Sequence, residues 1–226
     1  MYVKPDLASK VKAKVGRPAK FSRAHLQAAA LALVDGHGLG ALTMRALARK
    51  VGTGPMTLYN HVANRADLEV LVVEAVFAEV DWSHGRHADW RADVQAIAGA
   101  VRRVIRAHPH TIPLILTRRS RSPAVAAFAE ALLDALARSG RSAEELLIAF
   151  RAVSAFVTGF AQAELAGPLA REAGEAPAAV IKRFRALPRD RYPRLTEIAD
   201  AAMTSVAEIE FRRGLDLLLA GLAARA

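Results

Sequence analysis

Apolar residues recur every three or four positions along most of the chain, the spacing that buries one face of an α-helix. A first helix is predicted to begin after Ser22, which can cap it, and to end near Asp35, where glycines break the pattern. No alternating strand pattern competes, and the prolines fall at or between the apolar segments. The sequence therefore predicts an all-α fold. Beyond residue 82, the predicted helices cover residues 90–107, 111–117, 123–138, 143–166, 178–187 and 203–223.

Residues 42–61, LTMRALARKVGTGPMTLYNH, read as two short helices joined by a tight turn. Thr43 can cap the first helix, and Gly52 suits the left-handed backbone that ends it. Pro55 fits the first position of the second helix, which is predicted to extend to Val62. Helices this short are not stable alone, so they must rest on neighbouring helices. The second helix is then free to enter the major groove of DNA.

The pattern divides the chain into an arm and two domains. Residues 1–21 are predicted to form a flexible basic arm, and residues 22–81 a helix-turn-helix DNA-binding domain. A long helix capped by Asn64 ends that domain and packs against the DNA-reading unit. The polar segment 83–89, SHGRHAD, marks the boundary. Residues 82–226 are predicted to form a larger helical domain.

The charge of the chain is concentrated at its N-terminal end. The whole chain has 32 Lys and Arg against 22 Asp and Glu, a net charge of +10. Residues 1–65 hold eleven of these basic residues and two of the acidic ones, so the rest of the chain is nearly neutral. A basic end on a neutral body is typical of a protein that places one part on a polyanion.

Composition narrows the remaining classes. The chain has no cysteine, which excludes disulfides, thiolate metal sites and cysteine nucleophiles. The first twenty residues are polar and lysine-rich, unlike a signal peptide, so we expect a cytoplasmic protein. The longest apolar stretch, residues 146–163, has Arg151 near its centre, which favours a helix buried in protein over a membrane span.

Two segments carry a resemblance to a known family. ALTMRALARKVGTGPMTLYNHV and NRADL stand in the order and spacing of the DNA-binding domain of TetR-type transcriptional regulators. The rest of the chain is similar to the ligand-binding and dimerisation domain of regulators related to the tetracycline repressor. The resemblance implies an all-α homodimer that binds a palindromic operator in double-stranded DNA and is released by a small molecule.

Candidate DNA contacts follow from side-chain chemistry and from this resemblance. Arg45 has a two-pronged guanidinium that fits guanine O6 and N7, and a phosphate contact is its alternative role. Thr57 is placed for a base edge, and Pro55 and Met56 for a thymine methyl group. Phosphate contacts are expected from Thr43, Tyr59, His61 and Arg65, and a minor-groove contact from Arg17 in the arm. Tyr59 could instead pack between helices, where Leu58 and Val62 are expected, and His61 could be a surface residue without a role.

A cavity in a helical bundle is lined mostly by apolar and aromatic groups with a few polar ones. We therefore expect an unidentified, largely apolar ligand near Val101, Ile105, His108, Phe128, Leu132, Phe156, Phe160 and Gln162, each of which could equally be core. His108 and His110 straddle Pro109, so a helix-end turn is the alternative use for both. No histidine follows His110, which argues against a magnesium chelate of tetracycline as the ligand. Helices 143–166 and 203–223 are predicted to pair with their copies in a dimer, with Phe211, Leu215 and Leu218 at the seam.

Other chemistry is not expected. His84 and His87 lie in a polar linker without a rigid scaffold, so we read them as solvated and predict no metal. Ser154 and Thr158 are expected to bond to their own helix, and no nucleophile and base pair is recognisable, so no catalytic residue or cofactor is predicted. Two alternatives stay open: a ligand-independent architectural DNA protein, and a helical enzyme fused to a DNA-binding domain.

Overall fold

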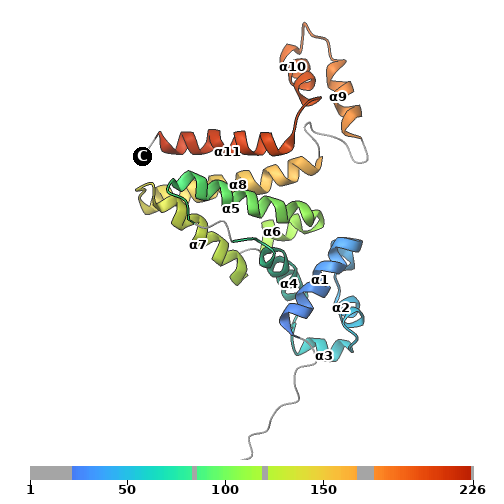
Figure 1. Ribbon diagram of the computed structural model, residues 1–226. Helices are drawn as coiled ribbons and strands as arrows, with labels where there is room; N and C mark the ends of the chain where they lie inside the picture. The colour runs from blue at the N-terminus through green and yellow to red at the C-terminus, as the bar shows by residue number, and fades with distance from the viewer. Residues whose placement is uncertain (1–21, 83–85, 119–121, 167–175, 225–226) are drawn as a thin grey trace, which may run out of the picture.

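The computed structural model describes residues 22–82, 86–118, 122–166 and 176–224. The described residues form α-helices and two short 3₁₀ turns, with no strand among them, so the predicted all-α fold is confirmed (Figure 1). The arm and its Arg17 lie outside the described residues. The part predicted to bind DNA, called the DNA-binding part below, lies at the bottom of Figure 1. It consists of α1 (Arg23–His37), η1 (Leu39–Ala41), α2 (Met44–Lys50), α3 (Pro55–Tyr59) and α4 (Arg65–Ala78).

Three predicted caps start the helices of the DNA-binding part. Ser22 Oγ accepts a hydrogen bond from the His25 amide at 3.1 Å, and Thr43 Oγ1 accepts one from the Ala46 amide at 3.1 Å. The side chain of Asn64 accepts from the amide of Asp67 at 3.0 Å. Each cap satisfies an amide that has no partner inside its own helix. All three predicted helix starts are confirmed.

The body of the molecule is a second group of helices above the first (Figure 1). It consists of α5 (Trp90–Ala107), η2 (Pro109–Thr111), α6 (Ile112–Arg118), α7 (Pro123–Ala137), α8 (Ala143–Ala166) and α11 (Ala207–Ala223). Helix α5 packs against α7 on one side and α8 on the other, and α11 lies along α8. The bounds predicted for α5 and α8 are confirmed.

Helix α4 joins the two groups of helices. It packs against α1 in the DNA-binding part and against α6 and α7 in the body. Ten consecutive residues of α4, from Leu68 to Phe77, are buried. One hydrophobic core therefore runs from Leu26 in α1 to Leu219 in α11 without interruption.

Helices α9 (Pro177–Arg185) and α10 (Pro193–Ala202) form a hairpin that projects from the body at the top of Figure 1. The two helices pack closely on each other, with Val180, Thr196 and Ala199 almost fully buried. The sequence analysis missed α10 and started the last helix at residue 203, whereas α11 begins at Ala207. The segment around α10 is rich in arginine and proline and has only a short apolar stripe, so the periodicity there is weak.

By length and composition alone, residues 143–165 of α8 could cross a membrane, and 28% of an apolar 18-residue window within them is buried. The expectation of a helix buried in protein therefore holds for one side only. Ala149, Val153, Val157 and Ala161 face the core, whereas Leu147 and Ile148 are more than half exposed. The protomer leaves an apolar face of α8 uncovered.

Candidate DNA-binding surface and effector domain

The turn between α2 and α3 is tight. Gly52 takes φ +71°, the left-handed conformation that the sequence analysis assigned to it, and the Thr53 amide donates to the Ala48 carbonyl at 2.8 Å. Leu47, Leu58 and Val62 point into the core and are at most 2% exposed. The packing predicted for Leu58 and Val62 is confirmed, and the opposite side of both helices faces solvent.

Every described residue predicted to contact DNA is exposed, and each lies on α2 or α3, beside one of these helices in the chain, or at the start of α4. Met56 is 80% exposed and Tyr59 48%, so neither is taken up by packing between helices. Exposed apolar and hydroxyl groups next to a guanidinium are the groups that read base edges. The exposed set is Thr43, Arg45, Pro55, Met56, Thr57, Tyr59, His61 and Arg65.

Arg65 has a structural role that the sequence analysis missed. Its Nη1 donates to the Leu42 carbonyl at 2.8 Å and its Nη2 to the Leu39 carbonyl at 3.2 Å, while Nε donates to Glu69 at 3.1 Å. These bonds hold the start of α4 against the turn that leads into α2. Arg65 therefore positions the recognition unit, and its contact with phosphate stays a prediction.

A second charged contact fixes α1 on α4. Glu74 is 5% exposed, and both of its carboxylate oxygens accept from Arg23, at 2.7 to 3.0 Å. Gln27 donates to the same carboxylate at 2.7 Å. Because a buried carboxylate is costly unless it is fully hydrogen-bonded, this contact selects one packing of the two helices.

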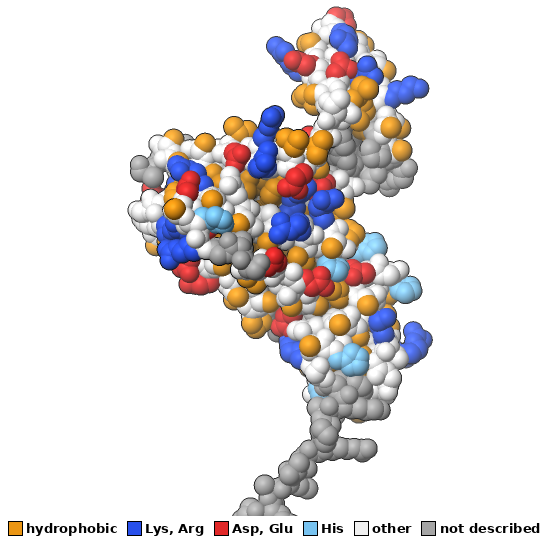
Figure 2. Space-filling view, viewed as in Figure 1, with side chains coloured by type: hydrophobic (Ala, Val, Ile, Leu, Met, Phe, Trp, Pro, Cys, Tyr) orange, Lys and Arg blue, Asp and Glu red, His pale blue; other side chains and the backbone are white. Residues whose placement is uncertain are grey.

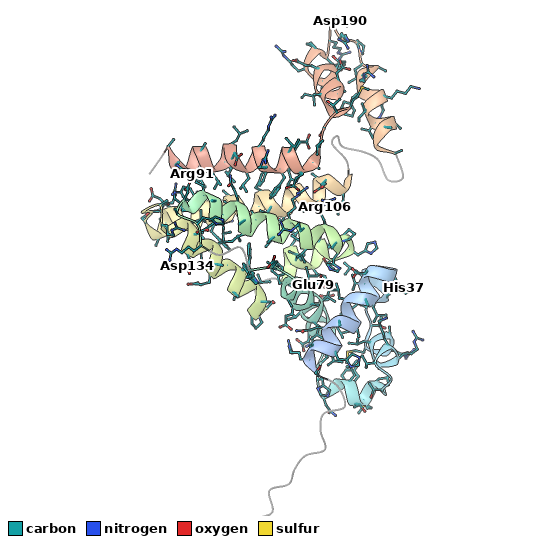
Figure 3. The ribbon with its side chains drawn as sticks, in the orientation of Figure 1. His37, Glu79, Arg91, Arg106, Asp134 and Asp190 are labelled. Atoms are coloured by element: carbon teal, nitrogen blue, oxygen red, sulfur yellow. The ribbon has the colours of Figure 1, made fainter. Side chains whose placement is uncertain are left out.

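His108 lies where the DNA-binding part meets the body. Its Nδ1 is 2.8 Å from Asp35 Oδ2 on α1, and its Nε2 is 3.0 Å from Glu79 Oε2 just after α4. Figure 3 labels Glu79 at this junction, and Figure 2 shows histidine and acidic side chains gathered there. Next to it, His110 Nδ1 lies 3.1 Å from the Val34 carbonyl. Both histidines thus serve contacts between elements at a helix end.

The other residues predicted to line a pocket lie in separate parts of the body. Val101, Ile105 and Leu132 are buried core, and Phe128 packs on Phe77 of α4 with ring centroids 5.7 Å apart. Gln162 is exposed on α8. None of the three cavities described in this structure is lined by any of the predicted pocket residues. The pocket assignment stays a prediction.

An aromatic cluster joins α8 and α11. Phe156 and Phe160, both predicted pocket residues, pack on each other and on Phe211, with ring centroids 5.3 to 5.7 Å apart. Gly214 permits this contact, because a Cβ there would lie 2.8 Å from the Phe156 ring. The cluster fixes α11 on α8.

Arg102 lies beside this cluster and is 1% exposed, with its guanidinium carbon 4.8 Å from the centroid of Phe211. It pairs with Glu164 on α8 and Glu208 on α11. Burial alone would lower the pKa of Arg102, but the two carboxylates raise it above its ordinary value, so the side chain stays charged. This charge ties three helices together, and local sequence patterns gave no sign of it.

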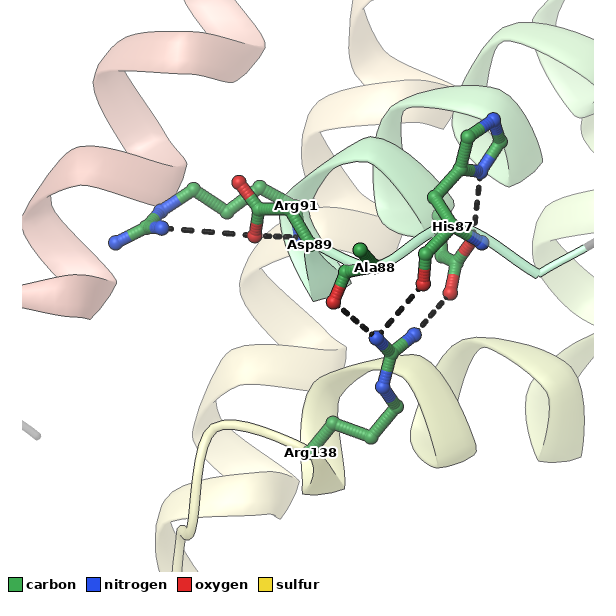
Figure 4. A network of polar contacts seen from close by, with 6 residues as sticks. His87, Ala88, Asp89, Arg91 and Arg138 are labelled. Atoms are coloured by element: carbon green, nitrogen blue, oxygen red, sulfur yellow. Dashed lines mark hydrogen bonds and ion pairs between the residues drawn. The ribbon is translucent and has the colours of Figure 1, made fainter.

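The segment that enters α5 is also held by charge (Figure 4). The amide and Nδ1 of His87 both lie 2.7 Å from Asp93 Oδ1. Arg138, directly after α7, donates to Asp93 and to the His87 and Ala88 carbonyls. His87 is exposed, as expected, but the sequence analysis missed that Asp93, which is only 6% exposed, holds its ring. His84 lies outside the described residues.

A cavity of about 370 Å³ opens beside this network, between α5 and α7. Its wall has two arginines, two aspartates and three apolar side chains: Arg86, Asp93, Ile97, Ala131, Asp134, Ala135 and Arg138. Within the part of the chain that the structure describes, no group of three His, Asp or Glu side chains is placed to hold a metal ion. Thr158 donates to the Ser154 carbonyl at 2.8 Å as expected. Ser154 Oγ is buried with no hydrogen-bond partner among the described residues, so that expectation was wrong for Ser154.

A short recognition helix with an exposed face of apolar and hydroxyl side chains, preceded by a tight turn and fixed on a helical body, defines a helix-turn-helix DNA-binding protein. Residues 26–69 match the family model for bacterial regulatory proteins of the tetR family, and residues 85–226 match that for the tetracyclin repressor-like C-terminal domain. The chain belongs to the TetR family of transcriptional regulators, with a DNA-binding and a ligand-binding domain. Proteins of this family are regulators and not enzymes.

Relatives are similar over nearly the whole chain. An HTH-type transcriptional regulator of Saccharopolyspora erythraea is 34% identical over 217 residues, 93% of this chain and 91% of that protein. The structure of apo ActR from Streptomyces coelicolor has a TM-score of 0.78 at 27% identity and covers 91% of this chain and 96% of its own. ActR in complex with actinorhodin has a TM-score of 0.76 at 28% identity, with coverages of 91% and 98%.

Proposed function

We propose that this chain is a repressor that binds a palindromic operator as a homodimer in the cytoplasm and is released by a small, largely apolar molecule. The observation that carries the proposal is the exposed row on α2 and α3, in which Arg45 and Thr57 stand beside apolar Met56. A side-chain set of this kind discriminates bases in the major groove, whereas a purely architectural protein needs only phosphate contacts.

The uncovered faces of α8 and α11 support a homodimer. Leu147 and Ile148 on α8 are 55% and 59% exposed, and Ile209 and Leu217 on α11 are 41% and 76% exposed. Such apolar surface on two adjacent helices is typical of an interface, and pairing with a second copy would complete a four-helix bundle. A two-fold axis would present two copies of α3 about one DNA turn apart, on the order of 34 Å.

The proposed seam differs from the one that the sequence predicted. Phe211 and Leu215 are 3% and 1% exposed, because they face α8 within the protomer, and Leu218 is half-buried. They are therefore poorly placed to meet a second copy. We assign the seam to Leu147, Ile148, Ile209 and Leu217, with exposed Ala155 and Gly159 allowing the helices to approach closely.

The ligand is proposed to act on the body and to be read at the DNA-binding part through α4. ActR, of the same fold, has been solved with actinorhodin, which supports a small-molecule effector for this chain. A ligand that separates the helices around Phe128 would shift α4, because Phe128 packs on Phe77. A coupling of about 1–3 kcal/mol would weaken operator binding roughly 5- to 150-fold.

Selection of the preferred duplex from a random pool tests the proposal. We expect a palindromic site, two protomers per duplex by mass, and much weaker binding to a scrambled duplex. A compound panel that includes actinorhodin should then contain molecules that both raise the melting temperature and release the operator. Equal affinity for selected and scrambled DNA would refute the repressor, and a monomer on DNA would refute the dimer. A Leu217→Lys variant should lose dimerisation, while Leu116→Lys, at an exposed leucine of α6, should keep it.

A further inference from the structure

We propose that His108 is a positioning residue for operator binding: charged and held between Asp35 and Glu79, it fixes the orientation of the DNA-binding domain relative to the body. This inference rests on the proposed function, which it deepens by naming the contact that sets the spacing of the two recognition helices. His108 follows α5, Asp35 lies in the last turn of α1, and Glu79 follows α4. A single side chain thus joins three elements at the junction.

The geometry requires both ring nitrogens. Nδ1 faces Asp35 at 2.8 Å and Nε2 faces Glu79 at 3.0 Å, and both partners are carboxylates. A neutral imidazole can donate from only one nitrogen, whereas the imidazolium donates from both. The full bridge therefore exists only while His108 carries its proton.

Asp35 depends on this bridge. Its Oδ2 accepts from His108, but its Oδ1 is buried and has no hydrogen-bond partner in the described structure. Loss of the His108 proton at Nδ1 would leave a half-buried carboxylate with neither oxygen satisfied. Because a half-buried carboxylate without hydrogen bonds is unfavourable, the end of α1 would then move toward water. This movement would change the orientation of the DNA-binding domain relative to the body.

The backbone of His108 is held rigidly. Its carbonyl accepts from the Thr111 amide at 3.0 Å and from Thr111 Oγ1 at 2.7 Å, and Thr111 is fully buried. Its own amide donates to the Ile105 carbonyl at 3.2 Å. The ring is therefore aimed by α5, the central helix of the body, and a shift of α5 acts directly on α1 and α4.

The surrounding charges favour the proton. Burial lowers the pKa of His108, but hydrogen bonds and charge from Glu79 and Asp35 raise it further, to a net increase over its ordinary value. Among the neighbouring groups, His110 is directed at the Val34 carbonyl and Arg106 pairs with Glu164. The bridge is thus complete below the ordinary histidine pKa of about 6.5 and is lost as the pH rises through the raised value.

A loosened junction weakens binding because two DNA-binding domains whose orientations vary more widely must be ordered when they engage both half-sites. We measure the affinity of the full-length protein for its selected operator between pH 6 and pH 8.5, at constant salt. Wild type should weaken roughly 10-fold across this range. The His108→Gln variant should bind weakly throughout with a flatter profile, and Glu79→Gln, at a half-exposed site that tolerates change, should lie between them.

Two histidine controls isolate the effect. His37→Gln, on the exposed last residue of α1, should keep the wild-type profile. His61→Gln removes a candidate phosphate contact and should bind more weakly, yet should keep the part of the pH dependence that comes from His108. A profile that is the same in wild type and His108→Gln would overturn the inference.

A measurement without DNA separates this inference from the proposed function. The chain has no cysteine, so spin labels can be attached through Lys50→Cys on α2 and Glu130→Cys on α7. The distance distribution should be narrow at pH 6 and should broaden at pH 8.5 or with His108→Gln. Equal widths under all three conditions would overturn the positioning role. If no operator can be selected, the proposed function fails, while the label distances still decide the role of His108.

Discussion

The guanidinium of Arg102 on α5 holds both carboxylate oxygens of Glu164 on α8, with Nε–Oε2 and Nη2–Oε1 distances of 3.0 and 2.9 Å. The two side chains are 1% and 10% exposed. Removing one member of a buried pair leaves the other charge without compensation. We expect Arg102→Met to lower the free energy of unfolding by about 3 kcal/mol, the low end of the usual range, because Arg106 stays 3.1 Å from Glu164. Urea unfolding measures the loss.

The matched control is Glu208, the other partner of Arg102, whose side chain is 69% exposed. Exposed ion pairs contribute less than about 1 kcal/mol, so Glu208→Gln should change stability little. Replacing both members of the buried pair, as Arg102→Met with Glu164→Leu, should recover part of the loss. Equal losses of unfolding free energy from Arg102→Met and Glu208→Gln would contradict the stabilising role of the buried Arg102–Glu164 pair.

Gly214 sets how closely α11 approaches α8. A Cβ at this position would lie 2.8 Å from the Phe156 ring, which Phe160 and Phe211 hold in place. Overpacking costs about 1–3 kcal/mol, more than the roughly 1 kcal/mol that alanine gains over glycine in a helix. We expect Gly214→Ala to lower the melting temperature. Gly99→Ala on α5, where a Cβ meets only an ordinary contact at 3.6 Å, should raise it.

Arg45 is predicted to read a guanine. Loss of a bidentate base contact costs about 1–3 kcal/mol, so Arg45→Ala should weaken operator binding roughly 5- to 150-fold and binding to random duplex only slightly. Arg49→Ala, at the exposed far end of the same helix, should weaken both duplexes alike. Competition binding at one fixed salt concentration measures, for each variant, the ratio of its affinities for operator and random duplex. If Arg45→Ala weakens binding to both duplexes equally, Arg45 makes only a phosphate contact.

Arg65 is predicted to stabilise the protein even without DNA. Arg65→Gln removes donors from the Leu39 and Leu42 carbonyls, and at about 1 kcal/mol for each hydrogen bond the free energy of unfolding should fall by about 1–2 kcal/mol. His61→Gln should leave stability unchanged. If Arg65 also contacts phosphate, the slope of log affinity against log salt should decrease by about one.

Asp93 links stability to pH. Burial raises the pKa of its carboxyl, but hydrogen bonds from His87 and the charge of Arg138 lower it further, to a net decrease. Its contribution is therefore complete above the ordinary pKa of about 3.9 and is lost as the pH falls through the lowered value. We expect Asp93→Asn to cost about 2 kcal/mol near pH 7 and less below pH 4. Melting curves of Asp93→Asn and of Asp134→Asn, an exposed control at the same cavity, test this.

Local signals predicted what depends on local structure. Thr43, Gly52 and Pro55 predict the helix-turn-helix unit. A capping side chain, a left-handed glycine and a first-turn proline each set the backbone conformation of only a few neighbouring residues, so each can be recognised from local sequence. The contacts missed by the sequence analysis join distant segments: Arg102 is 106 residues from Glu208, and His108 is 73 residues from Asp35. Periodicity shows that a face is buried but cannot show which charged partner arrives there from another helix. The seam prediction rested on the same kind of signal, since Phe211 is apolar whether it faces α8, as it does here, or a second copy.

Helix α4 is buried all round along Leu68–Phe77, so it belongs to the core of the body as much as to that of the DNA-binding part. A hybrid regulator made by exchanging DNA-binding parts would divide this shared core if the crossover fell just before Arg65. A graft with this crossover keeps α4 with its original body, so the incoming segment must re-create the Arg23–Glu74 contact. To change the operator specificity of this protein by domain exchange, the new DNA-binding part must first pack correctly against α4, and only then does its recognition of bases matter.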